Sequence, residues 1–225
     1  MPARRYASFF PQRMSSRVPG GAYSAALDGD DTVTDYLGIP DAQDTDAILV
    51  AQSIGTAGST TTFAATYTGS VAQMGPFGRA IRVVASGAAT SLFTVRGRDY
   101  LGQRMTEEFN LTGATAIVSE KCFRYIDEII WGATAATTID VGTSNSLGMR
   151  YKFKEIISEH KNGLPAAAAG AFIPGLVSTT ASIATNSDVR GRYTPATLLP
   201  DGSTSFEIRY IADRDNLYGN AQFYG

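Results

Sequence analysis

The sequence offers few side chains for nucleophilic or metal chemistry. Its 225 residues include one cysteine, Cys122, and one histidine, His160. A single cysteine excludes an internal disulfide and any cysteine-based metal cluster. A nucleophile–base pair would have to include His160, which lies in a polar, charged segment, and the chain has no G-x-S-x-G motif to supply the nucleophile. We therefore expect no catalytic residue and predict that His160 is a solvated side chain.

Two pairs of adjacent carboxylates have the residue types that hydrolyse glycosidic bonds by acid–base catalysis. They are Glu107–Glu108 and Asp127–Glu128. Both pairs lie in segments that alternate like β-strands, where successive side chains point to opposite faces. Neither pair can then share one site, and we predict that all four carboxylates are charges on strand surfaces.

Two further segments resemble ligand-binding loops, one for phosphate and one for calcium, but each is better explained without a ligand. The segment RGRDYLGQR (96–104) contains two glycines but lacks the GK[ST] ending of a phosphate loop, and the residues after it alternate like a strand. We predict a β-hairpin connection in which turn geometry accounts for Asp99 and the glycines. The Asp-rich segment 28–46 includes DGDD but lacks the ligand spacing and terminal Glu of a calcium loop. We expect neither a bound metal nor a cofactor.

The elements that would carry these side chains are short strands. Several segments have strand length, apolar or alternating patterns and Gly, Ser, Thr or Asn at their ends, which is typical of a sandwich or a barrel. They are 47–53, 79–86, 91–97, 104–111, 121–131, 138–142, 149–153 and 205–212. The best helical candidate is 154–163, with room for about two turns before Gly163 and Pro165 stop it. The pattern predicts an all-β fold.

The chain divides into an arm and a β domain. Residues 1–27 carry four arginines and no acidic residue, whereas residues 28–46 carry seven aspartates and no basic residue. Neither part has sustained periodicity, so we predict an extended N-terminal arm over 1–46 and a β domain over 47–225. The aromatic residues of the arm argue against the alternative of a solvated tail. The arm residues expected to contact a partner are Arg4, Arg5, Phe9, Phe10, Arg13 and Arg17.

Composition favours a surface that is partly covered by other molecules. Hydrophobic residues make up 44% of the chain and charged residues only 18%, with a net charge of −2. Residues 164–200 form a long neutral excursion with one or two expected strands, part of which we expect to lie along a neighbouring subunit. No stretch approaches the roughly 18 apolar residues of a membrane span, and the N-terminus lacks the apolar core of a signal peptide. We expect self-association and no membrane partner.

Three stretches resemble, in order and combination, a recurring pattern of small structural proteins of tailed bacteriophages, the capsid decoration (cement) proteins. The first, 93–113, has a G-x-D-x-x-G-Q turn followed by a T-E strand. The second is KCFRYIDEIIWGA (121–133), followed by a return strand at 138–153 that contains the LG pair. The third, 187–211, is a hairpin that SDVRGRYTP opens. The resemblance implies a β-sandwich, often jelly-roll-like, that assembles as homotrimers on the outer capsid lattice. It carries no catalytic residue over to this chain.

The function expected from the resemblance is a virion structural protein that stabilises a phage capsid by bridging subunits of the major capsid protein. It would be made in the cytoplasm of the bacterial host and end on the capsid surface. The arginines of the arm could make a minor contact with packaged DNA or bind an acidic groove on a protein neighbour. The alternatives are a tail or connector component, a carbohydrate-binding β-sandwich with Trp131 and exposed tyrosines as stacking platforms, and, furthest from the pattern, a glycosidase or peptidase.

Overall fold

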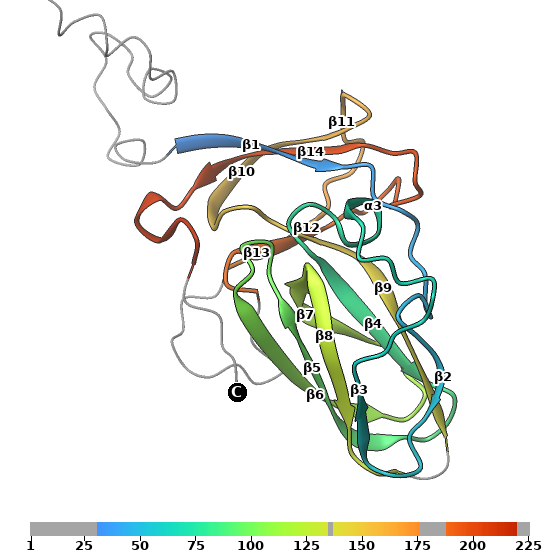
Figure 1. Cartoon of the computed structure of the whole chain (residues 1–225). Helices are drawn as coiled ribbons and strands as arrows, with labels where there is room; N and C mark the ends of the chain where they lie inside the picture. The colour runs from blue at the N-terminus through green and yellow to red at the C-terminus, as the bar shows by residue number, and fades with distance from the viewer. Residues whose placement is uncertain (1–30, 135–136, 176–187, 220–225) are drawn as a thin grey trace, which may run out of the picture.

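The computed structural model describes residues 31–134, 137–175 and 188–219, which form three antiparallel sheets (Figure 1). Sheet A has the order β1 (Asp31–Gly38), β14 (Phe206–Ala212), β10 (Phe153–Lys161) and β11 (Leu164–Pro165). Sheet B has the order β12 (Ala171–Pro174), β13 (Gly191–Thr194), β9 (Thr138–Gly148), β4 (Arg79–Ala85) and β7 (Ile117–Phe123), and β2 (Leu49–Ser53) also pairs with β9. Sheet C has the order β3 (Gly58–Thr60), β8 (Tyr125–Trp131), β5 (Thr90–Arg98) and β6 (Arg104–Thr112). The predicted all-β, sandwich-type fold is confirmed.

Among the described residues, helical structure is limited to two short pieces. The helix α3 (Val71–Met74) is capped by Ser70, whose side chain accepts a hydrogen bond from the backbone of Gln73. A 3-10 turn, η2 (Arg214–Asn216), follows β14. Within the described ranges, no helix has the length and apolar character that crossing a membrane requires.

Alternating apolar residues place two cores between the sheets. The larger core gathers side chains from β4, β5, β6, β8 and β9, including Phe93, Val95 and Trp131. The smaller core packs sheet A against the other end of sheet B around Phe153, Tyr193, Phe206 and Tyr210. Phe93 and Val95 are fully buried, as the alternation of 91–97 predicts.

The predicted single strand over 121–131 is in fact two strands that belong to different sheets. β7 pairs with β4 in sheet B, and β8 pairs with β5 in sheet C, with Arg124 between them. At this crossing the backbone of Gly97 lies so close to β8 that a Cβ atom would stand 2.1 Å from the carbonyl oxygen of Tyr125. Only glycine fits there, so this glycine serves the change of sheet rather than a ligand.

The helical candidate over 154–163 is wrong. The segment forms β10, which pairs with β14 on one side and β11 on the other. The strand is bulged, with register shifts between Phe153 and Glu155 and between Ile156 and Ser158. These bulges break the strict alternation by which a strand is recognised.

Part of the predicted arm is a strand of sheet A. Residues 31–38 form β1 and pair with β14, so the chain enters its own sheet before residue 47. The alternation was obscured because Asp35 occupies a core position between Val33 and Leu37. Burial raises the pKa of Asp35, which accepts hydrogen bonds from the Tyr210 hydroxyl at 2.7 Å and the Arg150 backbone at 3.0 Å. The proposed contact residues of the arm all lie outside the described residues: Arg4, Arg5, Phe9, Phe10, Arg13 and Arg17.

The described part of the excursion over 164–200 contains three short strands, β11, β12 and β13, where one or two were expected. All three pair with strands of this same chain: β11 with β10, and β12 with β13, which in turn pairs with β9. The described part of the excursion therefore extends sheets A and B. Residues 176–187 lie outside the described residues.

Candidate functional site

A cluster of buried charged side chains lies where sheets B and C meet, and we term it the junction. Each member is at most 9% exposed, which is unusual for charged residues unless they are paired. The members are Asp99, Glu107, Lys121, Asp188, Arg190 and Arg192. Their contacts join segments that are far apart in the sequence.

Side chains connect the edge strand of sheet B to the edge strand of sheet C. β7 ends sheet B and β6 ends sheet C, and the two are not paired through their backbones. Instead, the carboxylate of Glu107 on β6 accepts the backbone N–H groups of Glu120 at 2.6 Å and Lys121 at 3.0 Å on β7. The Lys121 ammonium donates in return to the carbonyl oxygen of Thr106 at 2.7 Å. Edge groups that would otherwise be buried without partners are thus satisfied.

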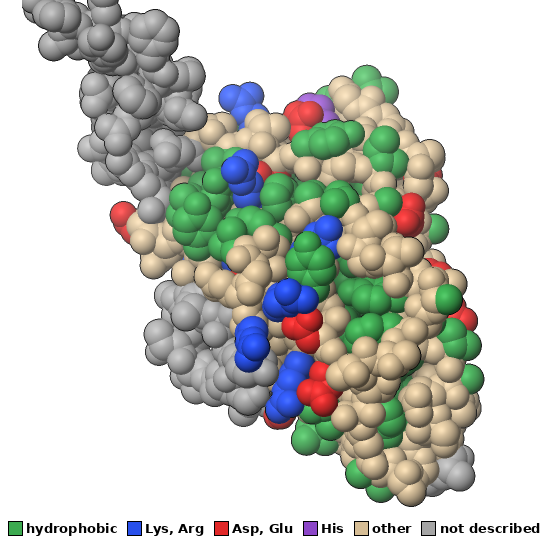
Figure 2. All heavy atoms as spheres, in the orientation of Figure 1, with side chains coloured by type: hydrophobic (Ala, Val, Ile, Leu, Met, Phe, Trp, Pro, Cys, Tyr) green, Lys and Arg blue, Asp and Glu red, His purple; other side chains and the backbone are tan. Residues whose placement is uncertain are grey.

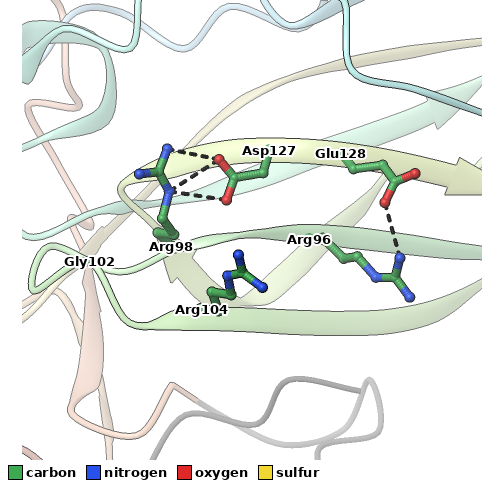
Figure 3. A pocket seen from close by; sticks show the side chains of 6 residues that line it. All are labelled: Arg96, Arg98, Gly102, Arg104, Asp127 and Glu128. Carbon is green, nitrogen blue, oxygen red and sulfur yellow. Dashed lines mark hydrogen bonds and ion pairs between the residues drawn. The ribbon is translucent and has the colours of Figure 1, made fainter.

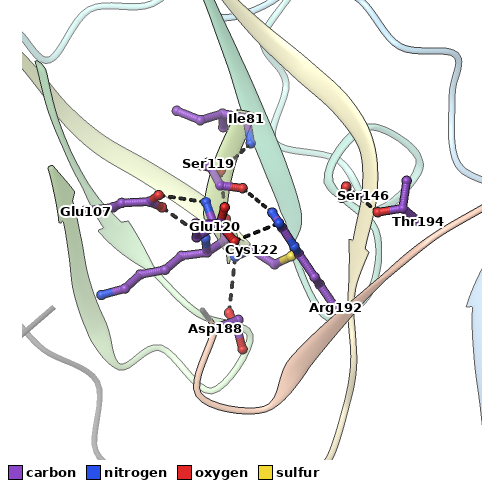
Figure 4. A network of polar contacts seen from close by, with 10 residues as sticks. Ile81, Glu107, Ser119, Glu120, Cys122, Ser146, Asp188, Arg192 and Thr194 are labelled. Carbon is purple, nitrogen blue, oxygen red and sulfur yellow. Dashed lines mark hydrogen bonds and ion pairs between the residues drawn. The ribbon is translucent and has the colours of Figure 1, made fainter. Parts of the chain in front are cut away.

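The segment 188–192 crosses this edge, and Figure 4 shows its Asp188 and Arg192 side chains pointing toward β7. Asp188 Oδ2 accepts the backbone N–H of Cys122 at 3.1 Å. Arg192 Nη1 donates to the carbonyl oxygen of Ser119 at 2.6 Å, while its Nη2 lies 2.7 Å from the carboxylate of Glu120. The period of two follows from the extended backbone that leads into β13.

Between these residues, Arg190 reaches the turn that joins β5 to β6. Its Nη1 lies 3.1 Å from Asp99 Oδ2, and both side chains are at most 1% exposed. The other oxygen of Asp99 accepts the backbone N–H groups of Leu101 at 2.9 Å and Gln103 at 2.8 Å. The guanidinium carbon of Arg190 also stands 4.8 Å from the ring centre of Tyr100. The predicted hairpin is confirmed, and its aspartate serves both the turn and a buried ion pair.

Burial dominates the ionisation of Glu107, Lys121 and Cys122. It raises the pKa of Glu107 to about 8. The two backbone N–H groups and the positive charge of Lys121 act in the opposite direction and lower this pKa, but their effect is smaller. Burial lowers the pKa of Lys121 and raises that of the Cys122 thiol well above its ordinary value. A buried thiol with a raised pKa is a poor nucleophile.

The prediction that all four candidate carboxylates lie on strand surfaces is wrong for Glu107. It occupies a core-facing position of β6, in line with Met105 and Phe109, and is 1% exposed. By contrast, Glu108 and Glu128 are half-buried and Asp127 is exposed. Sequence reasoning failed here because a carboxylate at a core position looks like a surface charge until its partners are known.

A second group of charged residues lines an open cavity of about 400 Å³ on sheet C, and we term it the arginine cavity (Figure 3). Its lining residues are Arg96, Arg98, Gly102, Arg104, Asp127 and Glu128. Arg98 binds Asp127 through its Nε at 3.1 Å and its Nη2 at 2.9 Å, and its guanidinium carbon lies 5.1 Å from the ring centre of Tyr125. Arg96 Nη1 lies 3.0 Å from Glu128. The side chains are held in place yet remain accessible.

The remaining chemical candidates are scattered. His160 is half-buried on β10, opposite Glu207 of β14 and Pro165 of β11, and no hydrogen bond is made by its Nδ1 among the described residues. The prediction of a solvated histidine is therefore only partly correct, because the side chain is partly exposed but its Nδ1 atom is buried. Cys122 is buried on β7 of sheet B beside the junction, whereas His160 belongs to sheet A. Across the described ranges, no three His, Cys, Asp or Glu side chains are grouped in a way that could hold a metal ion.

The charged members of the junction were missed as a group by sequence reasoning, although one signal was present. The segment Asp188–Val–Arg190–Gly–Arg192 alternates charged and small or apolar residues with a period of two. This pattern places three charges on one side of an extended chain.

Comparison with known proteins gives no relative: no family model, no curated protein and no solved structure matches this chain. We therefore infer function from the residues and the geometry of the chain itself.

Proposed function

We propose that this chain is a virion structural protein that decorates a phage capsid and stabilises it by bridging subunits of the major capsid protein. The observation that carries the proposal is the meeting of all three phage-like stretches at or beside the junction. Asp99 comes from the first stretch, Cys122 from the second, and Asp188 and Arg190 from the third. The return part of the second stretch is attached through the Arg150 carbonyl oxygen, which accepts a hydrogen bond from the Tyr100 hydroxyl at 2.6 Å.

This arrangement suggests a structural role for the pattern that the chain shares with the decoration proteins. Residues from the phage-like stretches hold sheets B and C and the segment before β13 together. A decorating protein must keep its shape on the shell. Buried ion pairs such as Arg190–Asp99 resist rearrangement, because separating them leaves a buried charge without its counter-charge. The resemblance is thus tied to rigidity rather than to a reaction.

The surface fits attachment to other proteins. Large apolar side chains are exposed on several strands and on the loop after β13, including Val50, Leu92, Val118, Leu164 and Leu198. Neutral and apolar contacts bury area without the cost of removing water from many charges. The proposed partners are the major capsid protein and further copies of this chain, and the proposed place of contact is the outer surface of the shell.

The proposal is tested by adding the purified chain to particles that lack it. We expect the chain to co-sediment with these particles and to protect them against heat or osmotic shock, measured by release of packaged DNA. Empty shells should bind the chain as well as filled ones do, since the principal partner is the capsid protein. Failure to bind either kind of particle contradicts a decorating role.

A truncated variant separates the arm from the β domain. Deleting residues 1–27 should leave cooperative thermal unfolding intact, because β1 begins at residue 31. The same variant should bind particles more weakly than the full chain, since an arm adds a second attachment at high effective concentration. Equal binding by both proteins would show that the arm takes no part in attachment.

A further inference from the structure

Exposed apolar side chains gather at one end of sheet A, and we term this surface the apolar end. Among the described residues, thirteen large hydrophobic side chains are exposed, and five of them belong to this surface. In Figure 1 it is the end where β1 finishes and where β11 and the loop before β14 lie, and Figure 2 shows hydrophobic side chains at the surface of the same region. Such a gathering marks an interaction surface, whereas single exposed apolar residues do not. The five side chains are Ile39, Val71, Leu164, Leu198 and Leu199.

Backbone hydrogen bonds join the segments that carry these side chains. The N–H of Gly202 donates to the carbonyl oxygen of Pro40 at 2.9 Å, which ties the loop before β14 to the segment after β1. The N–H of Asp41 donates to the carbonyl oxygen of Ala72 at 2.7 Å, which ties the same segment to α3. The apolar end is therefore one continuous surface rather than a set of independent loops. Its segments are 39–41, 71–74, 162–166 and 195–205.

The β10–β11 hairpin holds the loop before β14 in a defined conformation. Asn162 donates its N–H to the carbonyl oxygen of Ser205 at 3.0 Å and accepts the Ser205 N–H through its Oδ1 at 2.8 Å. The ammonium of Lys161, whose side chain is only 2% exposed, donates to the carbonyl oxygen of Thr197. The next residue, Leu198, has a φ of +48°, which a bulky residue keeps only where its surroundings impose it. The loop thus presents its two exposed leucines in a fixed position.

The charged side chains of the apolar end are negative. Its four segments contain two charged residues, Asp41 and Asp201, and both are exposed. Within the described residues, neither carboxylate forms an ion pair. Hydrogen bonds from the backbone of Thr204 and Ser203 lower the pKa of Asp201 to about 2, so this carboxylate is ionised at neutral pH. Two copies of this surface would bring like charges together, so its chemistry suits a partner that is both apolar and basic.

The N-terminal arm of the same chain has this chemistry. Residues 1–27, which lie outside the described residues, carry four arginines, several aromatic side chains and no acidic residue. The arm joins sheet A at Asp31, where β1 begins, whereas the apolar end lies beyond Gly38, where β1 ends. At about 3.3 Å per residue, β1 separates these two points by roughly 25 Å. The arm must turn back past β1 to reach its own apolar end, but it meets that of a copy placed end to end without reversing.

We propose that the arm of one copy binds the apolar end of the next, with its aromatic side chains against the exposed leucines and its arginines beside Asp41 and Asp201. The contact is head to tail, because it joins two different surfaces of the chain. It repeats from copy to copy until the rotation closes a ring. A ring of three is the trimer that the phage resemblance implies, and only this number rests on the proposed function.

Disulfide trapping between full-length chains of different tag mass tests the contact. One chain carries Phe9→Cys and the other Leu199→Cys, while the control pairs Phe9→Cys with Leu92→Cys, a similarly exposed position on sheet C. Cys122 is buried and does not compete. On mild oxidation we expect mixed dimers in severalfold excess over the control. Adding Leu198→Asn to the Leu199→Cys chain should remove this excess and preserve the fold, because asparagine adopts a positive φ readily.

Mixed dimers no more abundant than in the control overturn the proposal, and so does an excess that Leu198→Asn leaves unchanged. A single chain with both Phe9→Cys and Leu199→Cys shows whose arm is bound. Covalent multimers support the contact between copies, whereas monomers with an internal disulfide show that the arm binds its own chain and contradict it.

The same variants separate this contact from attachment to the shell. If trapping fails while Leu198→Asn weakens binding to particles, the apolar end contacts the capsid protein and the contact between copies is wrong. Because trapping is measured without particles, its failure is distinguishable from failure of the decorating role, which the particle-binding assay reports.

Discussion

The junction and the arginine cavity are built from the same residue types at nearly the same distances, but they differ in their exposure to water. Arg190 lies 3.1 Å from Asp99 with side chains 1% and 0% exposed, whereas Arg98 lies 2.9 Å from Asp127 with side chains 46% and 40% exposed. In the first pair, loss of one partner leaves a charge with no access to water. In the second pair, water and salt replace the lost partner readily. Burial, rather than pairing, decides which arginine maintains the fold and which is available to another molecule.

The largest effect should come from breaking the buried pair. Arg190→Ala leaves Asp99 buried without its counter-charge, and we expect a loss of about 3–5 kcal/mol in the free energy of unfolding. Chemical denaturation measures this loss. A paired replacement, Asp99→Asn with Arg190→Met, should recover part of it, because no charge is then buried alone. A cost below about 1 kcal/mol for Arg190→Ala would show that the junction does not hold the sheets together.

A pH-dependent effect should follow from Glu107. Its pKa is raised from an ordinary value of 4.5 to about 8, so between these values the folded state holds a proton that the unfolded state releases. The contribution of Glu107 to stability is therefore present below about pH 4.5 and is lost as the pH rises to 8, by at most about 1.4 kcal/mol per pH unit. Glu107→Gln removes this titration, so the stability advantage of the wild type over the variant should shrink between pH 5 and pH 8. An advantage that stays constant or grows across this range contradicts the raised pKa.

The smallest effect on stability should come from the cavity. Arg98→Ala removes an exposed ion pair and should change the free energy of unfolding by only about 0–1 kcal/mol. Measured under the same denaturing conditions as Arg190→Ala, it is the matched control for the buried pair. A cost comparable to that of Arg190→Ala would remove the distinction between the two regions.

The sequence predicted the all-β fold and most strand positions because Phe93, Val95 and their equivalents alternate between core and surface. It failed where a charged residue occupies a core position. Asp35 concealed strand β1, and Glu107 was assigned to the surface, because side-chain type alone cannot reveal a buried partner. The spacing of Asp188, Arg190 and Arg192 was visible as a period of two, but their partners Cys122, Asp99 and Ser119 are brought to them only by the tertiary fold.

The most direct test of the proposed role is electron cryo-microscopy of the phage particle that contains this chain. We predict density for the three sheets on the outer capsid lattice, in contact with major capsid protein subunits. Density located in the tail or the connector, or copies on the shell that contact no capsid subunit, would contradict the account.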